Sequence, residues 1–424
     1  MRIFFMINKT KYLIVGAGIS GLSFANFIHD NDYTIIESDP TPGGLCKTTY
    51  RNGFVWDYSG HFFHFNNPEI KQFFMNVIDQ KSLVENIKCT KIYFKGQLID
   101  YPFQKNIHQL PKEDCLDCIY ELFFRNDQEN YTNFLEMLYA KFGKGIVERF
   151  LKPYNEKLYA TDLNKLDPQA MGRFFPYATT EEIISNFKKT NNASYNGSFI
   201  YHKEGAFAFV KALLKNVDTS KIIYNKKIVK IDKAKKIAFS SDHEMFQYDH
   251  LICTAPFSSA LKMIDGEVNP VLSANTVIVY NLGFDGPAAD TSIHWIYYPE
   301  KEYVFYRVGF YNNIMKQPRM SLYVEIGQND SFPNQDATLD RVINDLKKVN
   351  IVSGQKLVDY EQLKISPAYV HISNVSTTFV CEKLKEYAKS SIYALGRYGK
   401  WEYSSIEDAV ISAKKLAETL ALPR

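Results

Sequence analysis

The sequence predicts an α/β fold in which a parallel-sheet domain carries two insertions, one helical and one built from an antiparallel sheet. Three patterns indicate this architecture. The chain begins with a short apolar strand, a glycine-rich turn and a second apolar strand. Apolar residues then recur at helical spacing through residues 112–185 and alternate with polar residues through residues 270–380. Each pattern is typical of one part of the predicted fold.

The first element is the apolar run Tyr12-Leu13-Ile14-Val15, which leads into the turn Gly16-Ala17-Gly18-Ile19-Ser20-Gly21. A second strand, Ile35-Ile36, ends in Glu37 and Ser38. Glycines let the backbone approach a pyrophosphate, the helix start supplies a positive dipole, and Glu37 can accept hydrogen bonds from ribose hydroxyls. The segment therefore predicts a Rossmann-like domain that binds a dinucleotide, although NAD enzymes and some plain tight turns share the glycine pattern.

A second glycine turn, Gly43-Gly44-Leu45, follows the acidic strand end. A glycine-lined turn at this point can lie along an extended cofactor instead of closing a compact βαβ unit. This favours FAD over NAD. The arrangement is similar to that of two-dinucleotide flavoproteins of the glutathione-reductase-like kind.

Length and composition allow such an enzyme. The 424 residues are enough for two or three domains, and 46% of them are apolar. The net charge of +3 argues against a nucleic-acid-binding surface. Aromatic residues make up 15% of the chain, and a surplus of tyrosine suits a large polar ligand pocket.

Cysteine spacing and hydropathy bear on the compartment. The six cysteines are scattered, and no second pair stands at zinc spacing from Cys115 and Cys118. No apolar run reaches the roughly eighteen residues that a spanning helix needs. We therefore expect a cytoplasmic protein with reduced thiols and without membrane insertion.

The predicted domains are discontinuous in sequence. The first sheet is predicted to include strands over residues 227–232 and 251–256, together with the hairpin to residue 239. The chain is predicted to end with a strand at 391–395 and a helix Ile406 to Ala421. The helical domain is predicted at residues 105–190. The cofactor domain is predicted at 8–85, 215–265 and 385–424, and the antiparallel-sheet domain at 86–104, 191–214 and 266–384.

Two further segments carry candidate site residues. In Gly60-His61-Phe62-Phe63-His64, a histidine in a glycine turn could contact an isoalloxazine ring, or it could be a packed histidine in an aromatic strand. The two histidines lack a third ligand at metal spacing. The run Tyr101-Pro102-Phe103-Gln104 offers two aromatic planes and an amide for a nucleobase, but by composition it could equally be an edge strand.

Taken together, these segments resemble the UDP-galactopyranose mutase family. The Gly60 turn resembles the bacterial form, and the Tyr101 segment resembles the eukaryotic form. Further matches follow in family order to about residue 420, which is far more specific than any single motif. They lie at residues 152–159 with 171–173, at 196–199, at 296–300 with 305–307, and at 395–403.

The resemblance implies roles for individual residues. His61, Arg173 and Arg307 would be the catalytic residues. His61 would lie beside the flavin, and the two arginines would clamp the UDP diphosphate, because guanidinium groups bind phosphate oxygens bidentately. Tyr297 and Tyr403 would donate hydroxyl hydrogen bonds to the same phosphates. Uridine contacts would come from Tyr101, Phe103, Gln104, Asn155 and Tyr159, with Asn196 beside them. Cofactor contacts would come from Gly16, Gly18, Ser20, Gly21, Glu37, Ser38, Gly43, Gly44, Leu45, Gly60, His61, Ile228, Gly396 and Arg397.

The implied reaction interconverts UDP-galactopyranose and UDP-galactofuranose, which supplies galactofuranose for surface glycans. Reduced FAD would attack the anomeric carbon through N5, without net redox change. An electron donor such as NAD(P)H or a reductase would then be needed, and a homo-oligomer is allowed. The chain departs from the family at Ser404-Ser405-Ile406-Glu407-Asp408, where eukaryotic members carry Asn-Gln-Asp-His, and at Tyr159, where they often carry tryptophan.

Two other functions remain open. An oxidoreductase of the amine-oxidase and protoporphyrinogen-oxidase kind shares the glycine turns and the C-terminal Gly-Arg motif. It explains neither the paired arginines nor the Tyr101 segment. A flavin-bearing binding protein without chemistry is permitted by the altered C-terminal segment.

Overall fold

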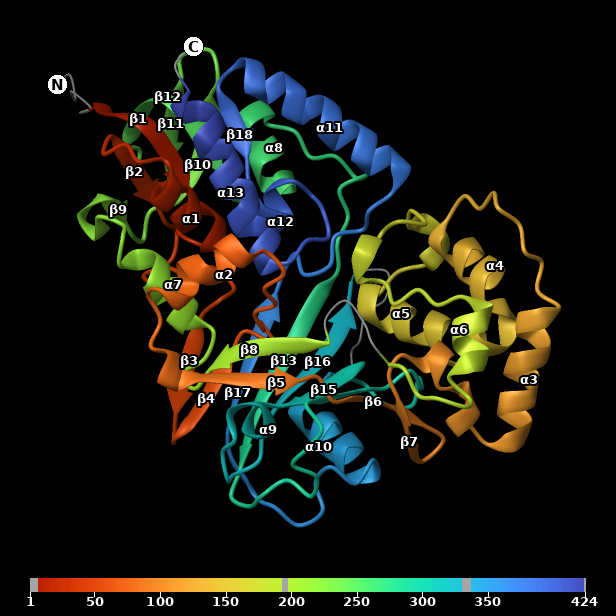
Figure 1. Cartoon of the computed structure of the whole chain (residues 1–424). Coiled ribbons are helices and arrows are strands. Elements are labelled where there is room, and N and C mark those ends of the chain that lie inside the picture. The colour runs from red at the N-terminus through yellow and green to blue at the C-terminus, as the bar shows by residue number, and fades with distance from the viewer. Residues whose placement is uncertain (1–6, 193–196, 330–336, 423–424) are drawn as a thin grey trace.

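The structure is a computed structural model of the chain, and it describes residues 7–192, 197–329 and 337–422 (Figure 1). A seven-stranded sheet in the order β10-β11-β12-β1-β2-β9, with β18 beside β12, forms its first layer. The strands around β1 are parallel, and β10 and β11 form an antiparallel edge. Its members are β1 (Ile7–Val15), β2 (Tyr33–Ile36), β9 (Ile222–Ile223), β10 (Ile228–Asp232), β11 (Ile237–Ser240), β12 (Met245–Cys253) and β18 (Ile392–Ala394).

Helices cover both faces of this sheet because β1 is apolar on both sides. Tyr12 and Ile14 pack toward α1, α7 and α13, and Leu13 and Val15 pack toward α8 and α11. A strand buried on both faces is typical of parallel sheets. The helices of this layer are α1 (Ile19–Phe27), α2 (Pro68–Met75), α7 (Phe207–Leu214), α8 (Phe257–Asp265), α11 (Asn374–Lys389), α12 (Gly396–Gly399) and α13 (Ile406–Ala421).

A second seven-stranded sheet has the order β17-β13-β16-β15-β14-β6-β7. It is antiparallel as predicted, except that β14 runs parallel to β6, a strand that comes from much earlier in the chain. Ile278 and Tyr280 of β13 face the cluster around α10, and Val277 and Val279 face the helical insertion. The elements are β6 (Thr90–Phe94), β7 (Gln97–Asp100), β13 (Thr276–Phe284), β14 (Trp295–Tyr297), β15 (Arg307–Phe310), α9 (Tyr311–Met315), β16 (Ser321–Gln328), α10 (Leu339–Lys348) and β17 (Leu357–Ile365).

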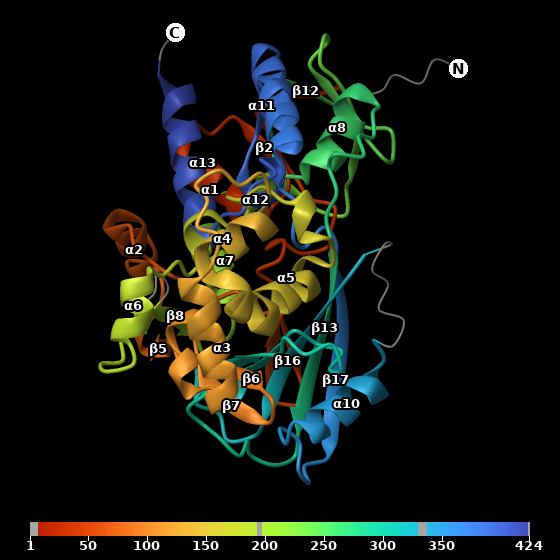
Figure 2. The ribbon, with the colours of Figure 1, turned by 90° about the vertical axis from the view of Figure 1, so that its right-hand side faces the viewer.

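The helical insertion stands beside the second sheet, on the right of Figure 1 and toward the viewer in Figure 2. It consists of α3 (Lys112–Phe123), α4 (Phe134–Ile146), a π-helical stretch (Val147–Leu151), α5 (Lys152–Tyr159) and α6 (Thr180–Ser185). Two small sheets link the layers: β3 (Thr48–Arg51) with β4 (Phe54–Asp57), and β5 (Leu83–Ile87) with β8 (Ser198–His202). The predicted fold class, a Rossmann-like domain with a helical and a sheet insertion, is confirmed.

The domain limits stay a prediction, but two helices bear on them. The predicted limits assign α7 and most of α11 to the sheet domain. In the structure, α7 packs on α1 and α11 packs on β18, both in the layer of the first sheet. Within the described residues, no helix is both long enough and apolar enough to cross a membrane.

Candidate active site

Glycines at the carboxyl end of β1 form a surface without side chains. Gly16 has φ +104°, and a Cβ on Gly21 would lie 2.0 Å from the Gly16 carbonyl oxygen. Gly18 pairs with Gly43 in an isolated bridge, and a Cβ on Gly44 would lie 3.3 Å from Gly18 Cα. The two predicted glycine turns therefore meet at one point, where only glycine fits at close approach.

The start of α1 offers hydrogen-bond donors beside this glycine surface. The helix begins after Gly18, which provides no side-chain cap. The first N–H groups of an uncapped helix, with the positive end of its dipole, form an anion site. Gly396 opens α12 at the same place, because a Cβ there would lie 2.3 Å from Ser20 Oγ. The first and last motifs of the sequence are thus brought together.

Glu37 lies at the end of β2 and is buried. Its Oε2 accepts a hydrogen bond from Ala17 N at 2.7 Å, and its Oε1 accepts from Asp39 N at 2.9 Å and from Ser38 Oγ at 3.2 Å. The carboxylate is held rigidly beside the glycine turn. Ile228 begins β10 two residues after Lys226, whose N–H donates to Glu37 O at 2.9 Å. A glycine surface, an uncapped helix and a fixed carboxylate fit a dinucleotide.

A cavity of about 680 Å³ lies next to the glycine surface. It is lined by Arg397, the residue after Gly396. It draws predicted residues from widely separated stretches of chain. Gly60, His61 and Tyr101 come from the N-terminal part, and Asn155 and Arg173 come from the helical insertion. Tyr297 and Arg307 come from β14 and β15, and Arg397 and Tyr403 from the C-terminal part.

His61 lines the cavity with a neutral ring. Burial lowers the pKa of His61 to about 4, against the opposing charge of Glu325. Among the described residues, its buried Nδ1 has no hydrogen-bond partner. A neutral imidazole with an unused nitrogen is suited to hydrogen bonding with a ligand in the cavity.

Arg307 is held by a buried carboxylate that the sequence analysis did not single out. Arg307 Nε donates to Glu325 Oε2 and Nη2 donates to Glu325 Oε1, both at 2.6 Å. The two residues are directly opposite on β15 and β16, and the Glu325 side chain is only 1% exposed. Ser59 Oγ also donates to Glu325. This bidentate pair fixes the guanidinium plane, so that Arg307 presents its remaining N–H edge in one orientation.

Arg173 lies at the exposed rim, in a 3₁₀ turn Gly172–Phe174. Its Nη2 donates to both oxygens of Asp408 at 2.7 Å. Asp408 belongs to the capping box of α13, in which it accepts from Ser405 N at 2.8 Å. The ion pair therefore joins the helical insertion to the first layer across the mouth of the cavity.

Arg397 lies among aromatic rings. Its guanidinium carbon is 4.2 Å from the ring centre of Tyr403, 5.5 Å from that of Tyr369 and 5.8 Å from that of Tyr398. Nη1 donates to Ser404 O at 3.3 Å, and within the described chain the buried Nε has no hydrogen-bond partner. A desolvated cation at the cavity wall favours an anionic ligand.

Three predicted uridine contacts lie behind the cavity wall. Phe103 is fully buried and stacks on Phe150 at 5.1 Å. Gln104 donates to Pro176 O, and Tyr159 is buried with an unpaired hydroxyl among the described residues. Asn196 lies outside the described residues. Their binding roles stay predictions.

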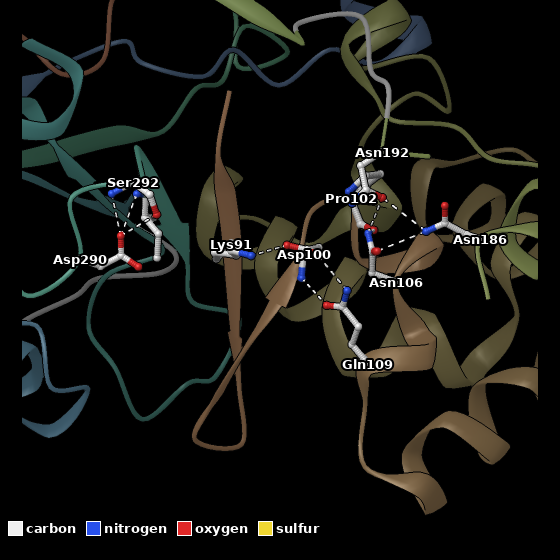
Figure 3. Close-up of polar contacts among 10 residues, drawn as sticks. Lys91, Asp100, Pro102, Asn106, Gln109, Asn186, Asn192, Asp290 and Ser292 are labelled. Carbon is white, nitrogen blue, oxygen red and sulfur yellow. Dashed lines mark hydrogen bonds and ion pairs between the residues drawn. The ribbon is translucent and has the colours of Figure 1, made fainter. Parts of the chain in front are cut away.

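Polar side chains anchor the segment that presents Tyr101 (Figure 3). Gln109 donates to Asp100 and accepts from its N–H, both at 2.8 Å, and Lys91 pairs with Asp100. Asn106 donates to Pro102 O at 2.9 Å and accepts from Asn186 at 3.2 Å. Tyr101 itself lies 5.5 Å from Tyr297, with the Lys88 Nζ 4.9 Å from its ring. A rigid aromatic wall results.

Sequence reasoning missed several cavity residues. These are Lys88, Lys105 and Tyr369, with Glu325 and Asp408 behind the arginines. The sequence contained one indication of Glu325. In the alternating run of residues 320–326, Glu325 lies on the same face as Ser321 and Tyr323, and the aliphatic residues lie on the other face. A carboxylate at an inward position of a buried strand indicates a cationic partner.

The sequence pattern of the family of flavin containing amine oxidoreductases matches residues 19–420 of the chain. The chain belongs to this family. FAD is therefore the cofactor of this amine oxidoreductase family member, which agrees with the glycine surface and the uncapped helix. The predicted cofactor is confirmed.

Among solved structures, this family member is similar to reduced UDP-galactopyranose mutase, with a TM-score of 0.91 at 24% identity over 97% of this chain and 95% of that chain. The predicted likeness to the mutases is confirmed at the level of the fold. Coproporphyrinogen III oxidase from Staphylococcus aureus is 23% identical over 284 residues, which are 57% of this chain and 60% of the oxidase. UDP-galactopyranose mutase from Mycoplasma pneumoniae is 21% identical over 197 residues, 42% of this chain and 49% of the mutase. The chain thus spans about half to three fifths of these curated relatives.

Proposed function

We propose that this flavin enzyme is a UDP-galactopyranose mutase, which interconverts UDP-galactopyranose and UDP-galactofuranose with the flavin reduced and without net redox change. The proposal rests on the cavity, which is lined by Arg173, Arg307 and Arg397 and borders the predicted cofactor site at Arg397. Three guanidinium groups and several tyrosine hydroxyls suit an anionic ligand such as a diphosphate far better than an apolar amine. The likeness in fold to reduced UDP-galactopyranose mutase supports it.

Each cavity wall would have its own task. Arg307, fixed by Glu325, would hold one side of the diphosphate, and Arg173 would close over it from the rim. Tyr297 and Tyr403 would donate hydroxyl hydrogen bonds to the departing phosphate, and Tyr101 and Asn155 would hold the uridine. Reduced flavin, when bound, would supply the nucleophile for the anomeric carbon. The protein's contribution is to keep UDP in place until the sugar recaptures it.

The test is anaerobic incubation of the purified protein with UDP-galactofuranose, with the flavin either oxidised or reduced by dithionite. UDP-galactopyranose is followed by chromatography. Conversion only in the reduced state is the expected result. Absence of conversion in both states, with FAD bound, would overturn the proposal, and retention of UDP without turnover would instead identify a flavin-bearing binding protein.

A second candidate is an oxidase, because the match to coproporphyrinogen III oxidase covers more of this chain than the match to the curated mutase. Oxygen consumption with coproporphyrinogen III would identify this activity. The proposed mutase additionally needs an electron donor, NAD(P)H or a reductase, to reduce its flavin. A cytoplasmic location, a role in surface glycan synthesis and a homo-oligomer belong to the same proposal.

A further inference from the structure

Lys157 lies on the last turn of α5, and its side chain reaches the loop that joins β14 to β15. Its Nζ donates to Tyr298 O at 2.8 Å and to Phe305 O at 2.5 Å. It also lies 3.0 Å from each of two further carbonyl oxygens, those of Glu300 and Tyr303. All four acceptors are backbone carbonyls of one loop, which is the kind of ligand that surrounds a monovalent cation in proteins.

Four carbonyl oxygens that point at one spot need a positive charge between them. Their partial negative charges repel one another, and burial removes the water that would otherwise solvate them. Burial disfavours the charge and lowers the pKa of Lys157 to about 7, against the opposing charges of Glu300 and Asp345. Below that pH the protonated amine supplies the positive charge that the four carbonyl oxygens require.

The caged loop lies directly between two cavity residues. Tyr297 precedes it and Arg307 follows it, and the loop is closed by the hydrogen bond from Tyr298 N to Tyr306 O at 2.9 Å. The helix α5, which carries Lys157, contributes Tyr154 and Asn155 to the cavity lining, and the Tyr154 ring lies 4.9 Å from that of Tyr297. One ammonium group thus holds the loop against α5, and both border the cavity.

The outer side of the loop is held independently of Lys157. Val304 N donates to Asp345 Oδ2 at 3.0 Å, and Arg341 Nη2 donates to Glu302 O at 2.6 Å. Both partners come from α10, on the far side of the sheet from α5. Loss of Lys157 should therefore loosen the inner side of the loop without unfolding the sheet.

We propose that the Lys157 ammonium fills a cage built for a monovalent cation, and that by filling it Lys157 positions Tyr297 and Arg307 against α5. Lys157 is a positioning residue, since it does not line the cavity. Only its effect on nucleotide affinity rests on the proposed mutase function. The cage itself is tested by stability alone.

The experiment compares the wild-type flavoprotein with Lys157→Ala at a pH below 7, in chloride buffers whose cation is choline, K⁺ or NH₄⁺. We expect the variant to have a Tm several degrees lower in choline, and K⁺ or NH₄⁺ to restore it along a saturable curve. UDP affinity, measured by titration, should fall roughly tenfold in choline and recover with the same cations. Lys152→Ala, a variant on the same helix whose ammonium forms an ion pair with Glu148, is the matched control and should show no cation effect.

Each outcome decides the proposal. A variant with wild-type Tm and affinity in choline, or a lowered Tm that no cation restores, would overturn it. If Lys157→Ala does not fold, Lys157→Met keeps the volume without the charge. That variant should then have a lower Tm with no response to cations, and a wild-type Tm would be the contrary result. If K⁺ or NH₄⁺ restores the Tm of Lys157→Ala but the wild type does not bind UDP, the cage is supported and the nucleotide function is rejected.

Discussion

The glycine end and the cavity are built in different ways. At the glycine end, backbone atoms of two short turns and the start of α1 make the surface, and Gly16, Gly21 and Gly44 each exclude a side chain. In the cavity, side chains from widely separated stretches converge, and two of the arginines are held by carboxylates from other elements. The first region is local in sequence, whereas the second exists only after the sheets and the insertion have packed.

This difference determines how each region should fail. At the glycine surface, any substitution that adds a side chain should disturb the backbone, but no side-chain interaction can be removed there. A site made of ion pairs tolerates shape changes at its rim but loses much when a buried partner is removed. Substitutions in the two regions should therefore separate cofactor loss from loss of turnover.

The most far-reaching effect is expected from Gly21→Ala, because loss of FAD would abolish turnover as well as cofactor binding. A Cβ at this position would lie 2.0 Å from the Gly16 carbonyl oxygen, so the turn and the start of α1 must move apart. We expect FAD affinity to fall by about a hundredfold or more, which corresponds to about 3 kcal/mol or more. The measurement is the flavin absorbance retained after gel filtration. Gly354→Ala is the control, because a Cβ there meets nothing within 4 Å. Full FAD retention in Gly21→Ala would contradict the described turn.

The second prediction removes the buried pair of the cavity. In Arg307→Ala, Glu325 remains buried without its cation, which costs about 3–5 kcal/mol for a buried pair. We expect kcat/KM for the UDP-sugar to fall about a thousandfold while FAD stays bound. Thermal unfolding should show that Arg307→Ala combined with Glu325→Gln is more stable than Arg307→Ala alone. A double variant that is less stable than Arg307→Ala would show that the two residues do not act as a pair.

Sequence reasoning succeeded where local pattern decides structure. The glycine turns, the strand that ends in Glu37 and the helix Ile406–Ala421 are confirmed at the predicted residues, because short-range backbone requirements determine them. It missed Glu325 and Asp408, because which carboxylate faces which arginine depends on strand register and on how α13 meets the insertion. The ring of Phe103 stacks on Phe150 behind the cavity wall, which the composition of the segment could not decide, and its role at uridine stays a prediction.

The third prediction concerns His61, which lines the cavity. Its pKa is about 4 in the folded protein and about 6.5 when unfolded, because burial disfavours the imidazolium. As the pH falls below about 6.5, the unfolded chain takes up a proton that the folded protein does not, so the free energy of unfolding decreases. Between pH 7 and pH 5 this loss should be about 2 kcal/mol.

Urea unfolding at the two pH values measures this dependence. His61→Asn should lose that part of the pH dependence, while the part due to His294, whose pKa burial also lowers to about 4, remains in both proteins. Equal pH dependence in the wild type and His61→Asn would mean that His61 titrates normally. FAD bound beside His61 would bury it further, so the flavin-loaded protein should show no weaker dependence than the flavin-free protein.

The smallest effects are expected at the exposed rim, where Arg173 is paired with Asp408. The Arg173 side chain is 48% exposed, so water and salt screen the pair, and Arg173→Ala should leave the Tm almost unchanged. In the proposed mutase, UDP affinity should fall about tenfold, because one charge-assisted contact to the diphosphate would be lost. Asp408→Asn should have the opposite effect, since the carboxylate would compete with the phosphates for the same guanidinium. We expect UDP to bind about twofold to threefold more tightly at low salt, with the gain disappearing at high salt.

The matched control at the rim is Ser405→Ala. It removes the hydroxyl of the same α13 capping box but leaves the Arg173–Asp408 pair in place. A loss of UDP affinity in Asp408→Asn as large as that in Arg173→Ala would show that Asp408 positions Arg173 rather than competing for it. The rim would then be a preorganised part of the cavity, like the Arg307–Glu325 pair, and the contrast between a buried inner ion pair and an exposed outer one would fail.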